Sequence, residues 1–228
     1  MAGTDARTAM IDAAERIVAE RGLAAMSLRE VQSAAGQSNK SAAQYHFGSR
    51  DGLISAVVEA RMGPIDRARR ALLDRLDPAA AADPRQLIEA LIRPLAAATL
   101  HHHGSCYARF LAQAMFDPTL TVIVREHLRA ESFRDVYRRL TRGTGLPEAV
   151  AALRTWHVVA LSVTSLATWE GLAAADALPF PDTALVVTDL VDSCVALLTT
   201  PTSLTDATLA DRPLPYGFLT DPTAGDAR

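Results

Sequence analysis

Residues 27–53 read SLREVQSAAGQSNKSAAQYHFGSRDGL and contain signals for two short helices, the turn between them and the start of a longer helix. Ser27 and Glu30 have the spacing of a capping box, in which the serine oxygen accepts the N–H of residue 30 and the carboxylate reaches back to the serine N–H. Gly36 permits the sharp turn that ends the first helix. Ser49 is placed to cap the longer helix.

These short helices, with a helix from Asp5 to Arg21 packed behind them, predict a helix-turn-helix unit, whose second helix can enter the ~12 Å major groove of B-DNA. On a helical projection one face of that second helix carries Asn39, Lys40, Ala43 and Gln44. Ala42 and Tyr45 lean the other way. The amides suit adenine, the lysine suits guanine and an alanine methyl suits thymine. Ser27 and Ser49-Arg50 offer N–H groups and a guanidinium to phosphates.

Charge gives modest support for DNA binding. The formal net charge of the chain is −3, whereas residues 27–50 carry three basic side chains, one of them Lys40, the only lysine, against the single acid Glu30, a local excess of +2. Short polar helices are also common on protein surfaces. An all-helical small-molecule-binding or metal-binding protein without a DNA role therefore stays an open alternative.

Composition indicates a soluble, cytoplasmic protein. Apolar residues make up 49% of the chain and charged residues 21%, which is a globular composition. The two cysteines, and an N-terminus without a secretory profile, favour a reducing compartment. The uncharged run at residues 155–169 has fifteen residues, which is short of the ~20 needed to cross a bilayer. No membrane association is expected.

The pattern stays helical beyond residue 53. One apolar stripe runs from Leu53 to Met62, and Gly63-Pro64 is expected to kink or break that helix. Further helices are predicted at 84–103, 105–116, 118–142, 147–175 and 182–199, and no segment has a strand pattern. The expected fold is therefore all-α.

Three segments of this chain resemble the N-terminal signature of the tetracycline-repressor (TetR) family of one-component regulators. These are Ser27-Leu28-Arg29-Glu30-Val31, then Ala35-Gly36, then Tyr45-His46-Phe47-Gly48-Ser49-Arg50-Asp51-Gly52-Leu53. The resemblance covers about residues 7–62, and the remainder matches in length, helicity and layout. The interval from Gly36 to Phe47 is one residue longer than in common members, and Arg50 stands where a lysine is usual.

The resemblance implies a three-helix DNA-binding domain at 1–48 and a helical effector-binding and dimerisation domain at 49–200. Residues 201–228 are expected to form a mobile tail, because four prolines and scattered aspartates replace the helical periodicity there. The resemblance also implies a ligand-responsive transcriptional regulator, with repression the favoured mode, that binds a palindromic double-stranded operator as a homodimer. The helices near 147–175 and 182–199 would form the dimer. The residues expected at the DNA are Ser27, Arg29, Ser38, Asn39, Lys40, Ser41, Ala43, Gln44, Tyr45, His46 and Arg50.

The residue types of the two C-terminal segments also favour a dimer, independently of the resemblance. The segment Val150–Ala175 is apolar on nearly all sides, and the segment 182–199 has no basic residue. Such helices must be buried, most simply in a four-helix bundle made by two copies of the pair. A monomer whose own helices cover these faces is the alternative. The second segment offers the apolar residues Leu185, Val186, Leu190, Val191, Val195 and Leu198, among others.

The effector is expected to be small and apolar or aromatic, because a ligand site needs mostly apolar walls with a few placed polar groups. The candidate walls are Tyr107, Phe110, Met115, Phe116, Trp156 and Trp169, and the candidate polar contacts are His102, Cys106, Gln113 and His157. Plain core packing is the alternative role for each of them.

No metal, cofactor or enzymatic activity is expected. The run His101-His102-His103 precedes Cys106, but adjacent helical residues point about 100° apart and no second pair of ligands is near. The sequence has no Gly-x-Ser-x-Gly elbow, no Gly-rich phosphate loop and no alternation of strand and helix. An all-helical enzyme with His157 or Glu170 as a base is an alternative that no feature selects.

Overall fold

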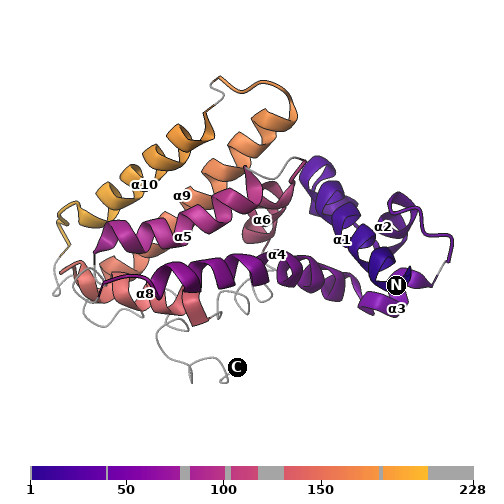
Figure 1. Ribbon diagram of the computed structural model, residues 1–228, viewed down its shortest axis with the longest axis horizontal. Helices are drawn as coiled ribbons and strands as arrows, with labels where there is room; N and C mark the ends of the chain where they lie inside the picture. The colour runs from indigo at the N-terminus through magenta and orange to yellow at the C-terminus, as the bar shows by residue number, and fades with distance from the viewer. Residues whose placement is uncertain are drawn as a thin grey trace. The chain divides into compact units, whose positions relative to one another are not determined.

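The computed structural model describes residues 2–39, 41–77, 83–100, 104–117, 131–179 and 182–204. All regular structure in these ranges is helical, and no strand occurs within them (Figure 1). The predicted all-α fold is therefore confirmed for the part of the chain that the structure describes.

The helices follow the predicted ranges closely. The N-terminal ones are α1 (Ala2–Arg21), the 3-10 helix η1 (Leu23–Ala25), α2 (Leu28–Ala34), α3 (Ala42–Phe47) and α4 (Arg50–Leu73). The later ones are α5 (Pro84–Thr99), α6 (Tyr107–Phe116), α8 (Glu131–Gly143), α9 (Glu148–Ala174) and α10 (Thr183–Thr199). Residues 118–130 of the predicted helix at 118–142, and the predicted tail from residue 205 onward, lie outside the described residues.

Helix α4 continues through Gly63 and Pro64, so a break at that point is ruled out. Proline removes one N–H donor and crowds the preceding turn. However, Pro64 is exposed, and the helix is anchored on both sides of it. Val58 before Pro64 and Ile65 after it are buried, and this burial offsets the loss of one backbone hydrogen bond.

The chain divides into two compact units. The first comprises Met1–Pro64, Ala98–His127 and Leu166–Leu178, and the second comprises Ile65–Ala97, Leu128–Ser165 and Pro179–Arg228. Helix α6 therefore belongs to the same unit as the N-terminal helices, and α4 and α9 contribute residues to both units. The boundary expected between residues 48 and 49 stays a prediction, because this division follows compactness and not function.

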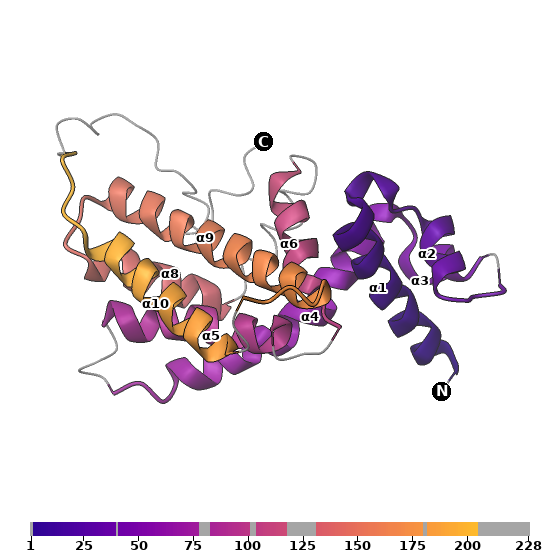
Figure 2. The ribbon, with the colours of Figure 1, turned by 90° about the horizontal axis from the view of Figure 1, so that it is seen from above.

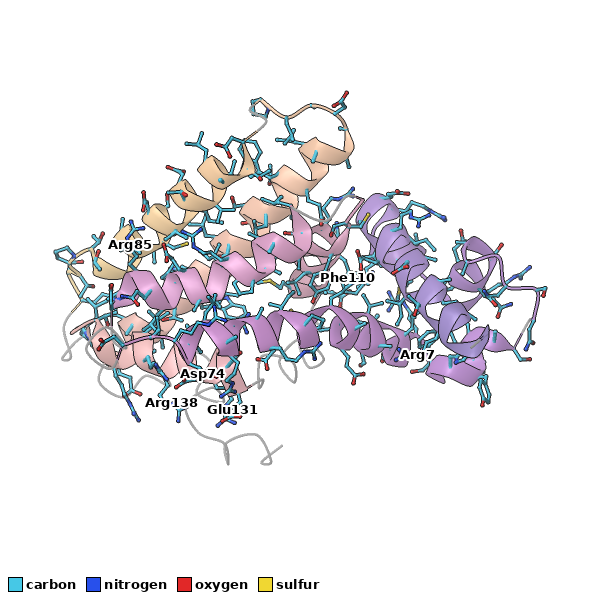
Figure 3. The ribbon with its side chains drawn as sticks, viewed as in Figure 1. Arg7, Asp74, Arg85, Phe110, Glu131 and Arg138 are labelled. Carbon is cyan, nitrogen blue, oxygen red and sulfur yellow. The ribbon has the colours of Figure 1, made fainter. Side chains whose placement is uncertain are left out.

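Helix α1 forms the centre of the core of the first unit. Its apolar residues recur at helical spacing, and Met10, Ala14 and Val18 are fully buried. It packs against α2, α3 and α6 (Figures 1 and 2). At the end of α3 the buried Phe47 lies under the Arg7 guanidinium, whose carbon is 5.7 Å from the ring centroid (Figure 3). The N-terminal helix thus supports both short helices that follow it.

In the second unit, the part of α9 up to Ser165 and α10 run antiparallel and side by side (Figures 1 and 2). Ser162 Oγ of α9 lies 3.9 Å from Cys194 Sγ of α10. Arg154 near the start of α9 donates to the backbone oxygens of Thr200 and Pro201, just past the end of α10. Helix α9 has the length and composition of a membrane span, but half of its apolar window is buried inside the protein, as in the core helix of a soluble protein.

One chain already covers much of the apolar surface that was expected to face a second copy. Val186, Leu190, Val191 and Leu198 of α10 are buried within the chain. These four side chains are covered by their own chain, and the dimer expected through residues 147–175 and 182–199 stays a prediction. Leu185 is 55% exposed, and Val195 is half-buried.

Candidate nucleic-acid interface

The N-terminus of α2 is capped by Ser27, as predicted. The serine backbone is extended, and its Oγ accepts the N–H of Glu30 at 3.1 Å. The Glu30 carboxylate pairs with Arg21 Nη1 at 2.6 Å, where the capping box predicts a bond back to the Ser27 N–H. This exposed ion pair joins the end of α1 to the first turn of α2. Ser27 and Arg29 are both exposed.

The turn after α2 contains one correction to the predicted recognition helix. Gly36 has a φ of 66°, which residues with a Cβ rarely adopt. Asn39 lies in a turn and not in the helix: its Oδ1 accepts the N–H of Ser41 at 3.1 Å, and its carbonyl accepts the N–H of Ala42 at 3.0 Å. Asparagine favours this kind of turn. Lys40 lies outside the described residues.

The outward side of α3 also differs from the projection. Ala42 and Ala43 are 7% and 1% exposed, because they pack the short helix into the first unit, where α3 contacts α1 and α2. Tyr45 is 85% exposed. The prediction that Ala43 faces DNA is therefore wrong, and Tyr45 does not lean inward. The buried side of α3 is decided by its packing against α1 and α2.

Several polar side chains remain on the outside of this unit. Ser38, Ser41 and Gln44 are exposed. Gln44 Nε2 donates to the carbonyl of Gly48 at 2.5 Å, so its side chain lies along the end of α3. His46 is half-buried, with its ring centroid 5.2 Å from that of Tyr45. The exposed surface here therefore consists of the hydroxyls of Ser38 and Ser41 and the amides of Asn39 and Gln44, next to the ring of Tyr45.

Arg50 fastens the start of α4 to η1. Its Nη2 donates to the carbonyl of Leu23 at 2.7 Å, and its Nε donates to the carbonyl of Met26 at 3.1 Å. Arg50 is half-buried, so it supports the unit from within, which the sequence did not predict. Ser49 caps α4 as predicted, with its Oγ accepting the N–H of Gly52 at 2.9 Å.

A groove of about 540 Å³ lies between α2 and α3. It is lined by Leu28, Arg29, Gln32, Ser33, Gln37, Ser38, Ala43 and Gln44. Arg29, Ser38 and Gln44 were predicted to contact DNA, and the groove brings them together. Gln32 and Gln37 were not predicted. Their positions in the sequence could have indicated this role, because Gln32 and Gln37 lie on either side of the Gly36 turn in a short polar segment.

The predicted effector residues divide between the two units. Cys106, Tyr107 and Phe110 are buried in the first unit, where the two rings stack with centroids 6.1 Å apart. In the same unit Gln113 is exposed, while Met115 and Trp169 are half-buried. In the second unit Trp156 is half-buried and His157 is exposed. His102 and the side chain of Phe116 lie outside the described residues.

Among the titratable groups near α6, Glu170 stabilises the start of that helix. Burial raises the pKa of the Cys106 thiol, and the Arg109 guanidinium opposes part of that effect. Glu170, a candidate base in the enzymatic alternative, is 3% exposed and accepts hydrogen bonds from the first turn of α6. Within the described ranges no three His, Cys, Asp or Glu side chains are grouped to hold a metal, and His101–His103 lie outside those ranges.

A capped helix, a glycine turn and a short helix with an exposed polar side define a helix-turn-helix DNA-binding protein. Residues 10–57 match the family model described as bacterial regulatory proteins, tetR family. The chain is also similar to the HTH-type transcriptional regulator BetI of Rhizobium meliloti (strain 1021), with 35% identity over 88 residues. That match spans 38% of this chain and 40% of the relative. Residues 10–57 therefore carry the DNA-binding domain that is typical of the TetR family of transcriptional regulators.

Proposed function

We propose that this protein is a repressor that binds a near-palindromic operator as a homodimer and is released by a small apolar or aromatic effector. The observation that carries the DNA contact is the 85% exposure of Tyr45, on a short helix whose Ala42 and Ala43 are buried. A tyrosine hydroxyl is among the groups that bind phosphate oxygens. The polar residues beside it are within reach of the same duplex.

The proposed contacts fall into two groups. Ser27, Arg29, Tyr45 and His46 contact the phosphate backbone, which fixes the register of the protein on the duplex. Ser38, Asn39, Lys40, Ser41 and Gln44 face the base edges in the major groove. Lys40 is the only lysine of the chain, and a lysine there suits guanine. Arg50 contributes by holding η1 and α4 together.

The proposed dimer uses the exposed side of α9 and α10. Leu153, His157 and Leu161 of α9 are spaced by four residues, so they lie on one side of that helix. Leu153 and Leu161 are 37% and 36% exposed, and Leu185 of α10 is 55% exposed. Two-fold symmetry would then match two operator half-sites.

The proposed effector contacts lie around α6. The stacked pair Tyr107 and Phe110 supplies apolar surface, and the half-buried Met115 and Trp169 belong to the same unit. An apolar or aromatic molecule would be favoured by such walls. A cytoplasmic location follows from the proposed contact with DNA.

The test is the affinity for a labelled DNA duplex that the wild-type protein selects from a random pool, measured by fluorescence anisotropy. Tyr45→Ala is expected to weaken binding by about tenfold or more, the effect of losing one hydrogen bond to a charged group. Leu204→Ala, which removes another exposed apolar side chain, is the matched control and should bind like wild type. Equal affinity of Tyr45→Ala and wild type would show that this surface does not contact DNA.

A further inference from the structure

The first turn of α3 takes hydrogen-bond partners from outside the helix. The first four N–H groups of a helix lack partners within it, and the side chain of Ser41, at the N-cap position, makes no capping bond. The Ser41 N–H donates to Asn39 Oδ1 at 3.1 Å, and the Ala42 N–H donates to the Asn39 carbonyl at 3.0 Å. The Ala43 N–H donates to Oε1 of Gln32, a residue of α2, at 3.4 Å. Gln32 thus caps α3 from the preceding helix, which packs beside it (Figures 1 and 2).

The bond from Gln32 is important because α3 is short. The helix has six residues, and a helix of that length is marginal in water without tertiary support. Ala43 is 1% exposed, so water is a poor substitute partner for its N–H group, and an unpaired buried N–H group is costly. The Gln32 side chain therefore helps to hold the start of α3 against α2.

The same bond fixes which way the Gln32 amide points. A glutamine amide carries an acceptor oxygen and a donor NH₂ group on the two branches of one planar group. Because the Ala43 N–H is a donor, it takes the oxygen, and the NH₂ group points away from it. Gln32 Nε2 makes no hydrogen bond with any residue that the structure describes. Gln32 is half-buried and lines the groove between α2 and α3, so its NH₂ group is what it offers to an acceptor that enters the groove.

We propose that Gln32 both positions α3 and contacts DNA: its carbonyl oxygen holds the start of α3, and its NH₂ group donates to a phosphate oxygen of the operator. The first helix of a helix-turn-helix unit crosses the DNA backbone, and α2 is that helix here. Glutamine is among the side chains that bind phosphate oxygens. Arg29, three residues earlier on the same face of α2, is exposed and brings a positive charge to the same groove. This inference rests on the proposed DNA-binding function and adds a residue to it.

Two substitutions separate the role of the oxygen from that of the nitrogen. Gln32→Glu keeps an acceptor oxygen for the Ala43 N–H but loses the NH₂ donor and adds a negative charge. Gln32→Met keeps the length of the side chain and loses both groups. Hydrogen exchange of the Ala43 N–H, followed by NMR on the full chain, reports the cap. Fluorescence anisotropy with the duplex that the wild type selects reports the DNA contact.

The exchange of the Ala43 N–H should be about fivefold or more faster in Gln32→Met than in wild type, and unchanged in Gln32→Glu. Affinity for the duplex should fall by about tenfold or more in both variants, because each loses a hydrogen bond to a charged group.

Two control variants isolate these effects. Ser33→Glu places the same charge at the next residue of α2, which lines the same groove, and measures charge repulsion alone. Gln32→Glu should bind about fivefold or more weaker than Ser33→Glu, a difference that a merely structural role of Gln32 would not give. Gln86→Met makes the neutral change at a half-buried glutamine of α5 and should leave both measurements like wild type.

The outcomes distinguish this inference from the proposed function. If wild type selects DNA but the Ala43 N–H exchanges equally fast in Gln32→Met and wild type, the inference is overturned and DNA binding stands. Equal affinities of Gln32→Glu and Ser33→Glu would also overturn it, because the NH₂ group would then make no contact. If wild type selects no DNA, both proposals are overturned. If Gln32→Met does not fold, Gln32→Glu and Ser33→Glu decide by their affinities.

Discussion

Gly52 is the residue in the first turn of α4 that has no room for a side chain. A Cβ at this position would lie 2.1 Å from the carbonyl oxygen of Phe47, which belongs to the backbone and cannot rotate away. We therefore expect Gly52→Ala to destabilise the protein by about 1–3 kcal/mol, the usual cost of overpacking. Urea unfolding followed by circular dichroism measures this change.

Gly171 of α9 is the matched control for this prediction. A Cβ there would meet Arg109 Cδ at 3.6 Å, which is ordinary contact. Alanine also has a helix propensity up to about 1 kcal/mol better than glycine. Gly171→Ala should therefore be as stable as wild type or more so. A Gly52→Ala protein as stable as Gly171→Ala would contradict the close approach at Phe47.

Alanine substitutions of Arg50 and Arg29 are expected to affect different properties: Arg50→Ala the stability of the fold, and Arg29→Ala the binding of DNA. Arg50→Ala removes two bonds to the carbonyls of Leu23 and Met26, so it should lower the free energy of unfolding by about 1–3 kcal/mol. Arg29→Ala changes an exposed side chain and should keep stability within about 0.5 kcal/mol. It should reduce the slope of log K for DNA against log salt by about 1. Urea unfolding and salt-dependent anisotropy separate the two, and the reverse pattern would overturn both assignments.

The helix caps could be predicted from the sequence, but the side of α3 that faces solvent could not. Ser27 and Ser49 cap α2 and α4 as their spacing indicated, because a cap depends on residues three positions apart. The burial of Ala43 depends on how α3 packs against α1 and α2. These contacts are tertiary and not local, so the sequence could not assign which side of α3 is exposed.

Helix α4 contains an exposed proline that the helix tolerates without a break. Pro64 lacks the N–H that an internal residue donates, and proline in a helix interior costs ~3 kcal/mol relative to alanine. We expect Pro64→Ala to raise the free energy of unfolding by about 1 kcal/mol or more, after allowing for the greater freedom of the unfolded chain. Pro94 inside α5 is buried, so Pro94→Ala should gain less because it also loses packing.

Urea unfolding of the two proline variants measures the difference between them. A Pro64→Ala protein less stable than wild type would show that the proline favours the folded shape of α4. Equal gains in both variants would show that burial at Pro94 contributes nothing.

The bounds of the helices were predicted well from the sequence, but the hydrogen bonds between helices were not. Apolar periodicity is a local property, so α5, α9 and α10 begin and end within a few residues of the predicted limits. The bonds from Glu15 and Glu170 to the start of α6 join residues 91 and 62 positions apart. No local pattern specifies such pairs, and from the sequence Glu170 is only a possible base.

At the scale of the whole molecule, the proposed dimer depends on a few exposed apolar residues of the second unit. Leu185 is 55% exposed, so Leu185→Asp should leave the fold of one chain intact. If two copies of α10 meet there, the substitution places two unpaired charges in an apolar contact. We expect a shift from dimer to monomer in light scattering after size exclusion, together with weaker operator binding.

Leu204→Asp is the control for the dimer prediction, because Leu204 is also exposed, at 42%, and follows α10. It should keep the mass and operator affinity of wild type. If Leu185→Asp also keeps the wild-type mass, the dimer does not use this side of α10. The sequence could not supply this surface: α10 has many apolar residues, and only tertiary packing decides which of them one chain covers.

The most direct test of the account is a hydroxyl-radical footprint on DNA selected from a random pool by the wild-type protein. If the surface around Tyr45 reads the major groove in a symmetric pair, the selected DNA contains two inverted half-sites. Protection should then appear as two matching patches whose centres are about one helical turn apart, or a multiple of it. No enriched sequence, or a single patch without inverted symmetry, would contradict the account.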